Sequence, residues 1–175
     1  MSDSDGFREA IPQNAPAHLR LTYDDYCRIP SEQRYELIGG GLRMVPSPSV
    51  FHQTVCGNLM AAFWRWAEER GLGVFYFSPI DVVLSDHDVV QPDILFVTKE
   101  RRGIIREKNI KGAPDLVVEV ISPSAGNRDR FEKHGLYARY GVRELWLVDL
   151  KDQSVEVAVL RDGELVTHEV HRYGF

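Results

Sequence analysis

The spacing of hydrophobic residues changes along this chain, and each change predicts a different element. Between residues 49 and 70, apolar side chains recur every three or four positions, which predicts a helix with one buried face. That face consists of His52, Val55, Cys56, Leu59, Phe63 and Trp66, and Gly71 ends the helix. A second helix is predicted over 128–140, with Lys133, Leu136, Tyr137 and Tyr140 on one side and Gly141 after its end. Thr22 and Asp25 form a capping box, which predicts a short helix before Pro30.

Short apolar runs between these helices predict strands. They lie at 35–38, 42–45, 74–77, 80–84, 91–97, 115–121, 144–149, 155–160 and 165–170. The first two form an N-terminal hairpin and the last two a C-terminal hairpin across Asp162-Gly163. A turn at 122–127 leads from one strand to the second helix, and the strand–helix–strand unit over 115–149 predicts parallel strands joined by a crossover. The expected fold class is therefore α/β or mixed α+β, with residues 1–18 as a flexible tail and 19–175 as a single domain.

Composition narrows the class of protein. A hydrophobic fraction of 43% and a charged fraction of 27% are typical of a globular domain. No apolar run reaches the length of a membrane span and no signal peptide is visible, so no membrane partner and a cytoplasmic location are expected. The two cysteines, Cys27 and Cys56, are far apart, which argues against a disulfide framework and a zinc site.

Charge is distributed unevenly. The net charge of −5 argues against a protein that coats nucleic acid. Residues 91–139 nevertheless hold 10 Lys and Arg against 7 Asp and Glu, whereas residues 1–90 hold 7 against 12. This basic segment is either a solvated loop face or part of a surface for an anionic substrate.

Two carboxylates interrupt apolar strands: Asp93 and Glu119. Burying such groups is costly unless a positive partner is present, and a hard divalent cation is the usual partner for oxygen ligands. Alternation along the strands would let the two acids face each other if the strands are neighbours. A Mg²⁺ or Mn²⁺ ion held there, with Lys133 orienting a water, would suit phosphodiester hydrolysis. The alternative is a pair of buried structural salt bridges, formed with Arg128 or Lys133.

Two further residues are candidates for this site. Glu36 lies on an early strand beside a glycine-rich turn, and the alternative for it is a surface acid. His52 lies near the start of the first long helix, on its inward face, where it could contact a phosphate or assist proton transfer. The alternative for His52 is a hydrogen-bonded core histidine.

The ordered series of these motifs resembles the Uma2-type restriction endonuclease family, which belongs to the PD-(D/E)XK nuclease superfamily. The series runs through Tyr-Glu-Leu-Ile-Gly-Gly-Gly at 35–41, His52, Gln-Pro-Asp-Ile at 91–94, Ala-Pro-Asp-Leu-Val-Val-Glu-Val-Ile-Ser-Pro-Ser at 113–124, Arg-Asp-Arg-Phe-Glu-Lys at 128–133, Tyr137, and Tyr-Gly-Val-Arg-Glu-Leu-Trp-Leu-Val-Asp at 140–149. The resemblance implies a restriction-endonuclease-like core, a mixed sheet flanked by helices. It also implies that Asp93 and Glu119 are the metal acids and that Glu36 is an additional acid. Ile121 stands where the superfamily has a lysine, and Lys133 is its substitute from the next helix.

The function expected from these residues and the resemblance is a Mg²⁺- or Mn²⁺-dependent endonuclease that hydrolyses DNA. A homodimer is expected because duplex cleavage needs two sites or sequential nicking. One alternative is a catalytically silent nuclease-fold module that binds nucleic acid or another partner, which Ile121 and the acidic total favour. Another is an enzyme acting on RNA; no cluster of exposed aromatic residues is visible to favour single strands, and Trp66 is assigned to the core.

Overall fold

The computed structural model describes residues 20–30, 33–121 and 127–173, with the backbone alone at 127–130. The chain forms two compact units: residues 1–47 with 83–90, and residues 48–82 with 91–175. The predicted tail at 1–18 and the predicted turn, as far as residue 126, lie outside the described residues. The single domain expected over 19–175 stays a prediction.

The first unit contains a short helix and a small sheet. The helix α1 (Tyr23–Cys27) begins at the predicted capping box, because Thr22 and Asp25 exchange side-chain and backbone hydrogen bonds. Four strands follow one another in this sheet, in the spatial order β2 (Gly41–Val45), β1 (Arg34–Ile38), β5 (Asp88–Val90) and β4 (Asp81–Ser85), and β7 (Asn109–Lys111) is its fifth strand. The hairpin of β1 and β2 was predicted, whereas the three-residue β5 is too short to leave a periodic signal.

The second unit is built on a six-stranded mixed sheet. Its strands, in spatial order, are β11 (Glu164–Arg172), β10 (Ser154–Arg161), β9 (Glu144–Asp149), β8 (Leu116–Ile121), β6 (Ile94–Thr98) and β3 (Gly73–Phe77). β8 and β9 are parallel and are connected through helix α3 (Asn127–Tyr140), which confirms the predicted crossover. The other neighbouring pairs are antiparallel, including the predicted hairpin of β10 and β11.

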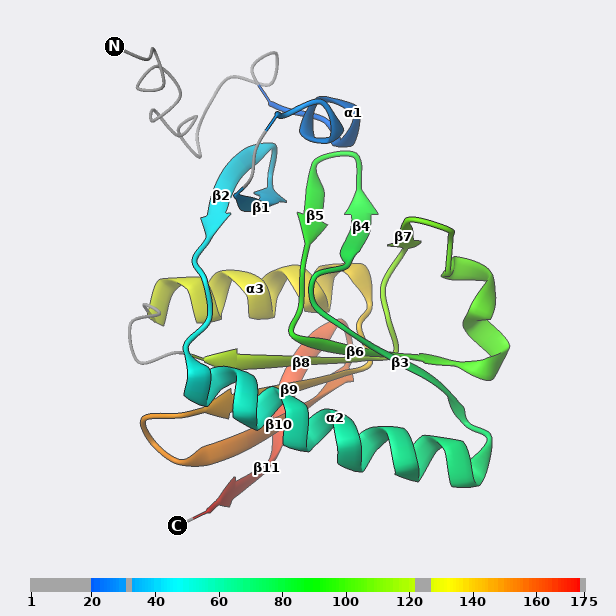
Figure 1. Cartoon of the computed structure of the whole chain (residues 1–175), viewed down its shortest axis with the longest axis vertical. Helices are drawn as coiled ribbons and strands as arrows, with labels where there is room; N and C mark the ends of the chain where they lie inside the picture. Colours follow the sequence, from blue (N-terminus) through cyan, green and yellow to red (C-terminus); the bar gives the residue numbers. More distant parts are fainter. Residues whose placement is uncertain (1–19, 31–32, 122–126, 174–175) are drawn as a thin grey trace. The chain divides into compact units, whose positions relative to one another are not determined.

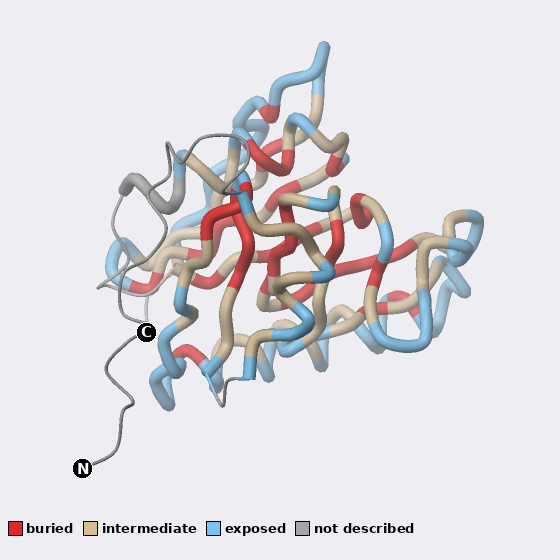
Figure 2. The backbone as a smooth tube through the Cα atoms, turned by 90° about the horizontal axis from the view of Figure 1, so that it is seen from above, coloured by how far each residue is buried: buried red, intermediate tan, exposed pale blue. Residues whose placement is uncertain are grey.

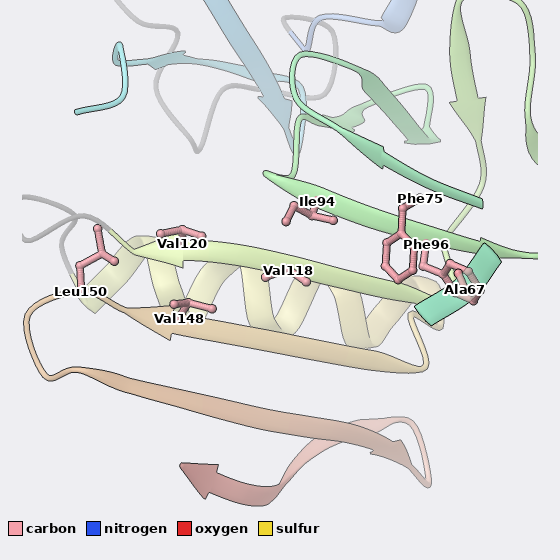
Figure 3. Close-up of a cluster of buried hydrophobic side chains, with 8 residues drawn as sticks. All are labelled: Ala67, Phe75, Ile94, Phe96, Val118, Val120, Val148 and Leu150. Atoms are coloured by element: carbon pink, nitrogen blue, oxygen red, sulfur yellow. The ribbon is translucent and has the colours of Figure 1, made fainter. Parts of the chain in front are cut away.

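Two helices cover opposite faces of this sheet, as Figure 1 shows: α2 (Val50–Arg70) on one side and α3 on the other. Figure 2 shows the buried stretches of the chain in red, and many of them belong to strands. Figure 3 shows the apolar cluster on the face that α2 covers. Its buried members are Ala67, Phe75, Ile94, Phe96, Val118, Val120, Val148 and Leu150. The α2 side chains that pack there are Val55, Cys56, Leu59, Met60 and Phe63, as the helical period predicted for most of them.

The assignment of Trp66 to this core was wrong. Ala67 is 3% exposed and continues the buried face beyond Phe63, whereas Trp66 is 45% exposed. Positions three and four residues after Phe63 are both compatible with a helical face. Ala67, the smaller side chain, packs in the cluster against the sheet, whereas both tryptophans of α2, Trp64 and Trp66, are exposed to solvent.

The segment between β6 and β8 is more structured than a loop. It contains a 3₁₀ helix, η2 (Lys99–Ile104), and the short strand β7 (Asn109–Lys111). At the start of β3 the chain passes so close to β6 that a Cβ atom at Gly73 would lie 2.3 Å from the carbonyl oxygen of Val97. Among the helices described, none combines the length and the apolar composition that crossing a membrane requires.

Candidate active site

The two predicted acids occupy opposing positions on neighbouring strands. β6 and β8 pair antiparallel, with Ile94 opposite Val118 and Leu95 opposite Val117. Asp93 directly precedes β6, so Asp93 and Glu119 are the next opposing positions of this register. The sequence predicted that the two acids could face each other if their strands were neighbours. This condition is met, because β6 and β8 are neighbours in the sheet.

One oxygen of Asp93 is held in place by the chain. Its Oδ2 accepts a hydrogen bond of 2.7 Å from the backbone N–H of Val120 and lies 3.3 Å from Nε2 of His52. The side chains of His52 and Asp93 are only 10% and 17% exposed. Within the described part of the chain, no group donates a hydrogen bond to the other oxygen, Oδ1. The carboxylate is therefore oriented through one oxygen and has the second available for a ligand.

His52 connects α2 to the strands. The backbone N–H of His52 donates to the hydroxyl of Ser49, which caps the helix, and its ring reaches the carbonyl oxygen of Val120 at 3.1 Å. The hydrogen bond with Asp93, helped by the neighbouring Cys56, raises the pKa of His52 to about 10, although burial alone would lower it. At neutral pH His52 is therefore a cation beside Asp93. The inward orientation predicted for His52 is confirmed, since the residue is 8% exposed.

His52, Cys56 and Asp93 place one ligand atom each within 4.8 Å of one another, which is close enough to consider a metal. The imidazole, however, presents Nδ1 to the sulfur of Cys56 at 3.5 Å and Nε2 to Asp93. A single ion cannot use both nitrogens of one ring in this arrangement. The three side chains form a hydrogen-bonded chain that orients Asp93.

Glu119 is held from the opposite side of the sheet, by α3. Nζ of Lys133 lies 3.2 Å and 3.3 Å from its two carboxylate oxygens, and the hydroxyl of Tyr137 donates to Oε1 at 2.5 Å. Lys133 and Glu119 are 14% and 13% exposed, so little water screens the pair. The structure thus brings the predicted lysine to one of the predicted acids.

The contact between Tyr137 and Glu119 was not predicted, although the sequence contains a signal for it. Lys133 and Tyr137 are four residues apart, so their side chains share one helix face. Tyr137 is fully buried, and a buried phenol needs a hydrogen-bond partner. An acid on the strand under that face was the available acceptor.

Glu36 lies in the first unit, on β1 opposite Arg43 of β2. It is 4% exposed, so the alternative of a surface acid is wrong. Its role as an additional site acid stays a prediction. Arg128, the other cation considered for the two acids, lies among the residues whose side chains are not described.

Part of the basic segment is structural. Arg101 donates to Asp115 at 3.0 Å and to the carbonyl oxygen of Ala113 at 2.8 Å. Asp115 is buried and also accepts from the backbone N–H of Thr98, and Arg143 lies 3.2 Å away. Burial raises the pKa of Asp115, but the Thr98 and Arg101 hydrogen bonds outweigh it and leave the pKa below its usual value. Asp115 therefore pairs with two arginines, Arg101 and Arg143.

The donor set at Asp93 and Glu119 fits a hard divalent cation. Glu119 lies on β8 and Asp93 directly precedes the neighbouring strand β6. Both are carboxylates, and carboxylate oxygens are the ligands that Mg²⁺ and Mn²⁺ prefer. Asp93 keeps Oδ1 available among the described residues. His52 and Lys133 already pair with the two carboxylates, so a bound cation would compete with these contacts.

Comparisons with known proteins identify the fold and the family of this chain. A crystal structure described as a "putative nuclease belonging to DUF820", from Anabaena variabilis ATCC 29413, superimposes with a TM-score of 0.72 at 21% identity, covering 87% of this chain and 85% of that chain. The fold is therefore the mixed α/β fold of this class of nuclease-like proteins. Residues 22–174 match the family described as "Uma2: Putative restriction endonuclease", and the chain belongs to that family. A search of curated proteins found no match.

Proposed function

We propose that the protein is a metal-dependent endonuclease that hydrolyses DNA phosphodiester bonds, with Asp93 and Glu119 as the metal ligands and Lys133 as the catalytic cation. The observation that carries this proposal is that Asp93, directly before β6, lies in register with Glu119 of β8, and that Nζ of Lys133 lies within 3.3 Å of Glu119. Family membership supports a nucleic-acid substrate.

Each residue of the proposed site has a distinct task. A bound Mg²⁺ or Mn²⁺ would supply a water of lowered pKa and polarise a phosphoryl oxygen. His52 and the Val120 N–H hold Asp93 so that Oδ1 faces the ligand, and Tyr137 holds Glu119. Lys133 would orient the attacking water or offset negative charge that develops on the phosphate oxygens. Lys133 would thus take the role of the lysine that the superfamily has at the position of Ile121.

Cleavage of supercoiled plasmid in Mg²⁺ or Mn²⁺ tests this proposal. Asp93→Asn and Glu119→Gln keep the shape of each side chain and should abolish cleavage. Lys133→Met should reduce the rate about 10²- to 10³-fold, the usual cost of losing one charge-stabilising group. The exposed Lys151 provides the matched control, since Lys151→Met should cleave like the wild type. Cleavage that persists in both Asp93→Asn and Glu119→Gln would sink the assignment.

A second candidate is a catalytically silent nuclease fold that binds nucleic acid or another partner. The observation that favours it is the pairing of Glu119 with Lys133 and Tyr137, which satisfies the acid without any metal. A calorimetric titration with Mn²⁺ separates the two functions. The nuclease should bind Mn²⁺ in a manner that depends on Asp93 and Glu119, whereas the silent module should show no carboxylate-dependent binding.

We further propose a homodimer as the form that cuts both strands of a duplex. One site per chain gives nicks, and two related sites give double-strand breaks. Sedimentation of the protein on an uncleaved duplex in Ca²⁺, together with the ratio of linear to nicked plasmid at early times, tests this. Purely monomeric protein that nevertheless linearises plasmid in one binding event would contradict it.

A further inference from the structure

A cleft of about 450 Å³ lies at the far end of α2 from His52, between that helix, the start of β3 and the 3₁₀ helix η2. Its volume is within the range of small-molecule sites. Its floor is the backbone around Gly73, where the absent Cβ lets the strands approach closely. The side chains that reach it include Trp64, Glu68, Lys99 and Arg102.

The two walls of the cleft differ in chemistry. Trp64 and Glu68 are four residues apart on α2 and share a helix face, with Trp64 50% exposed. Lys99 and Arg102 are three residues apart in η2, and side chains at that spacing eclipse each other in a 3₁₀ helix. The same cleft is thus lined by an exposed tryptophan and by two neighbouring cations.

Lys99 and Arg102 differ in their contacts from Arg101, which lies between them in the chain. Arg101 is committed to Asp115 and Ala113, whereas within the described part of the chain neither Lys99 nor Arg102 makes a side-chain hydrogen bond or ion pair. The solvated-face interpretation of the basic segment does not explain why two of its cations line a cleft beside a tryptophan. An aromatic ring with an attached phosphate would use both walls.

We propose that the cleft binds one unpaired nucleotide of a single-stranded segment of the nucleic acid on which the enzyme acts. The base stacks on Trp64, the phosphate lies between Lys99 and Arg102, and Glu68 accepts a hydrogen bond from an amino group of the base. Stacking on an aromatic side chain is the usual way in which proteins hold unpaired bases. At position 4 of the ring, cytosine presents an amino donor and thymine presents the O4 acceptor. Because a carboxylate only accepts hydrogen bonds, a contact of Glu68 at this position favours cytosine over thymine.

The position of the cleft relates it to the proposed active site, and to that extent the inference rests on the proposed function. Asp93 directly precedes β6 and Lys99 directly follows it. The six residue steps from Asp93 to Lys99 span about 20 Å along an extended strand. Successive phosphates in one strand of a duplex are about 3.4 Å apart along the helix axis, so the two sites are about six nucleotides apart on a duplex strand. A duplex substrate with an unpaired base should therefore be cut about six nucleotides from that base.

Binding measured without any metal isolates this site from catalysis. The probe is a fluorescein-labelled eight-nucleotide oligo(dC), followed by anisotropy in EDTA with the full chain. Trp64→Ala should weaken binding about 5- to 150-fold, which corresponds to the 1–3 kcal/mol of one stacked base. Trp66→Ala is the matched control and should bind like the wild type, because the guanidinium of Arg70 covers that ring at 5.4 Å. Trp64→Phe should retain part of the affinity, which guards against a folding defect.

Two further measurements test the walls separately. Replacing Lys99 and Arg102 by alanine should make the salt dependence of log Kd shallower by about 0.7 for each phosphate that these side chains neutralise in the wild type. Glu68→Gln should reduce the preference for oligo(dC) over oligo(dT). Equal reductions of affinity in Trp64→Ala and Trp66→Ala would refute the cleft as the site, and dCMP that binds as tightly as the oligonucleotide would refute a strand as its occupant.

The outcomes separate this inference from the nuclease assignment. Asp93→Asn should bind oligo(dC) like the wild type. If Trp64→Ala binds normally while plasmid cleavage persists, the cleft is refuted and the nuclease stands. If binding depends on Trp64 but no metal supports cleavage, the nuclease is refuted and a nucleic-acid-binding cleft stands.

Discussion

Replacing His52 by alanine tests how the fold holds Asp93. The variant removes a partner that lies 3.3 Å from Oδ2 of Asp93 and 3.1 Å from the carbonyl oxygen of Val120. Losing one member of a buried ion pair costs about 3–5 kcal/mol. Because the two side chains are 10% and 17% exposed, solvent screens the pair in part, and we expect a loss of about 2–3 kcal/mol. For a domain of this length that is a drop of about 4–12 °C in Tm.

The pH dependence of this loss identifies its cause. The pKa of His52 is raised from 6.5 to about 10, so its contribution is fully present below pH 6.5 and is lost as the pH rises through about 10. Urea denaturation of the metal-free protein should therefore show a large difference between wild type and His52→Ala at pH 6 and little difference near pH 10.5. Gln53→Ala, at the exposed neighbouring position, is the control and should match the wild type at both values. A loss of the same size at both pH values would mean that packing, and not the charge pair, is responsible.

Three further predictions concern other contacts. Gly73→Ala should destabilise the protein by at least about 1–3 kcal/mol, since the added Cβ would lie 2.3 Å from a backbone oxygen; an unchanged melting temperature would contradict this close approach. Tyr137→Phe removes the hydrogen bond that orients Glu119 and should weaken Mn²⁺ binding about 10- to 100-fold in calorimetry. An unchanged affinity would show that Lys133 alone is enough to orient Glu119. Arg101→Met should lower stability at pH 7 by about 1.5–3 kcal/mol. Because the lowered pKa of Asp115 adds stability above pH 3.8 that is lost as the pH falls through the folded value, the same variant should lose less stability than the wild type on acidification.

The sequence predicted the parts of the fold that have a long or strongly periodic signal. The helix that carries Lys133 follows directly after the strand of Glu119, so the short connection made their contact predictable. The face of α2 was predictable as far as Phe63, but the period cannot choose between Trp66 and Ala67, and only packing against the sheet decides.

Other features depend on contacts between distant segments. Glu36 is buried because of the strands around β1, and nothing in its local sequence indicates this. Asp115 becomes the centre of a salt bridge only when η2 brings Arg101 back to it. The cleft at Trp64 likewise needs residues from α2, β3 and η2 together, which no local pattern could predict.

Strand β8 presents neighbouring residues to opposite sides of the sheet, and this affects when the site can exist during folding. Glu119 meets Lys133, 14 positions away in the chain, whereas the ring of His52 reaches Val120 across 68 positions. The first contact is local and can form early, but the second must wait for α2 to dock. A chain that is only partly folded, for example during synthesis, would have one oriented acid and not two. Under the proposed function, the protein would therefore cut nucleic acid only after its folding is complete.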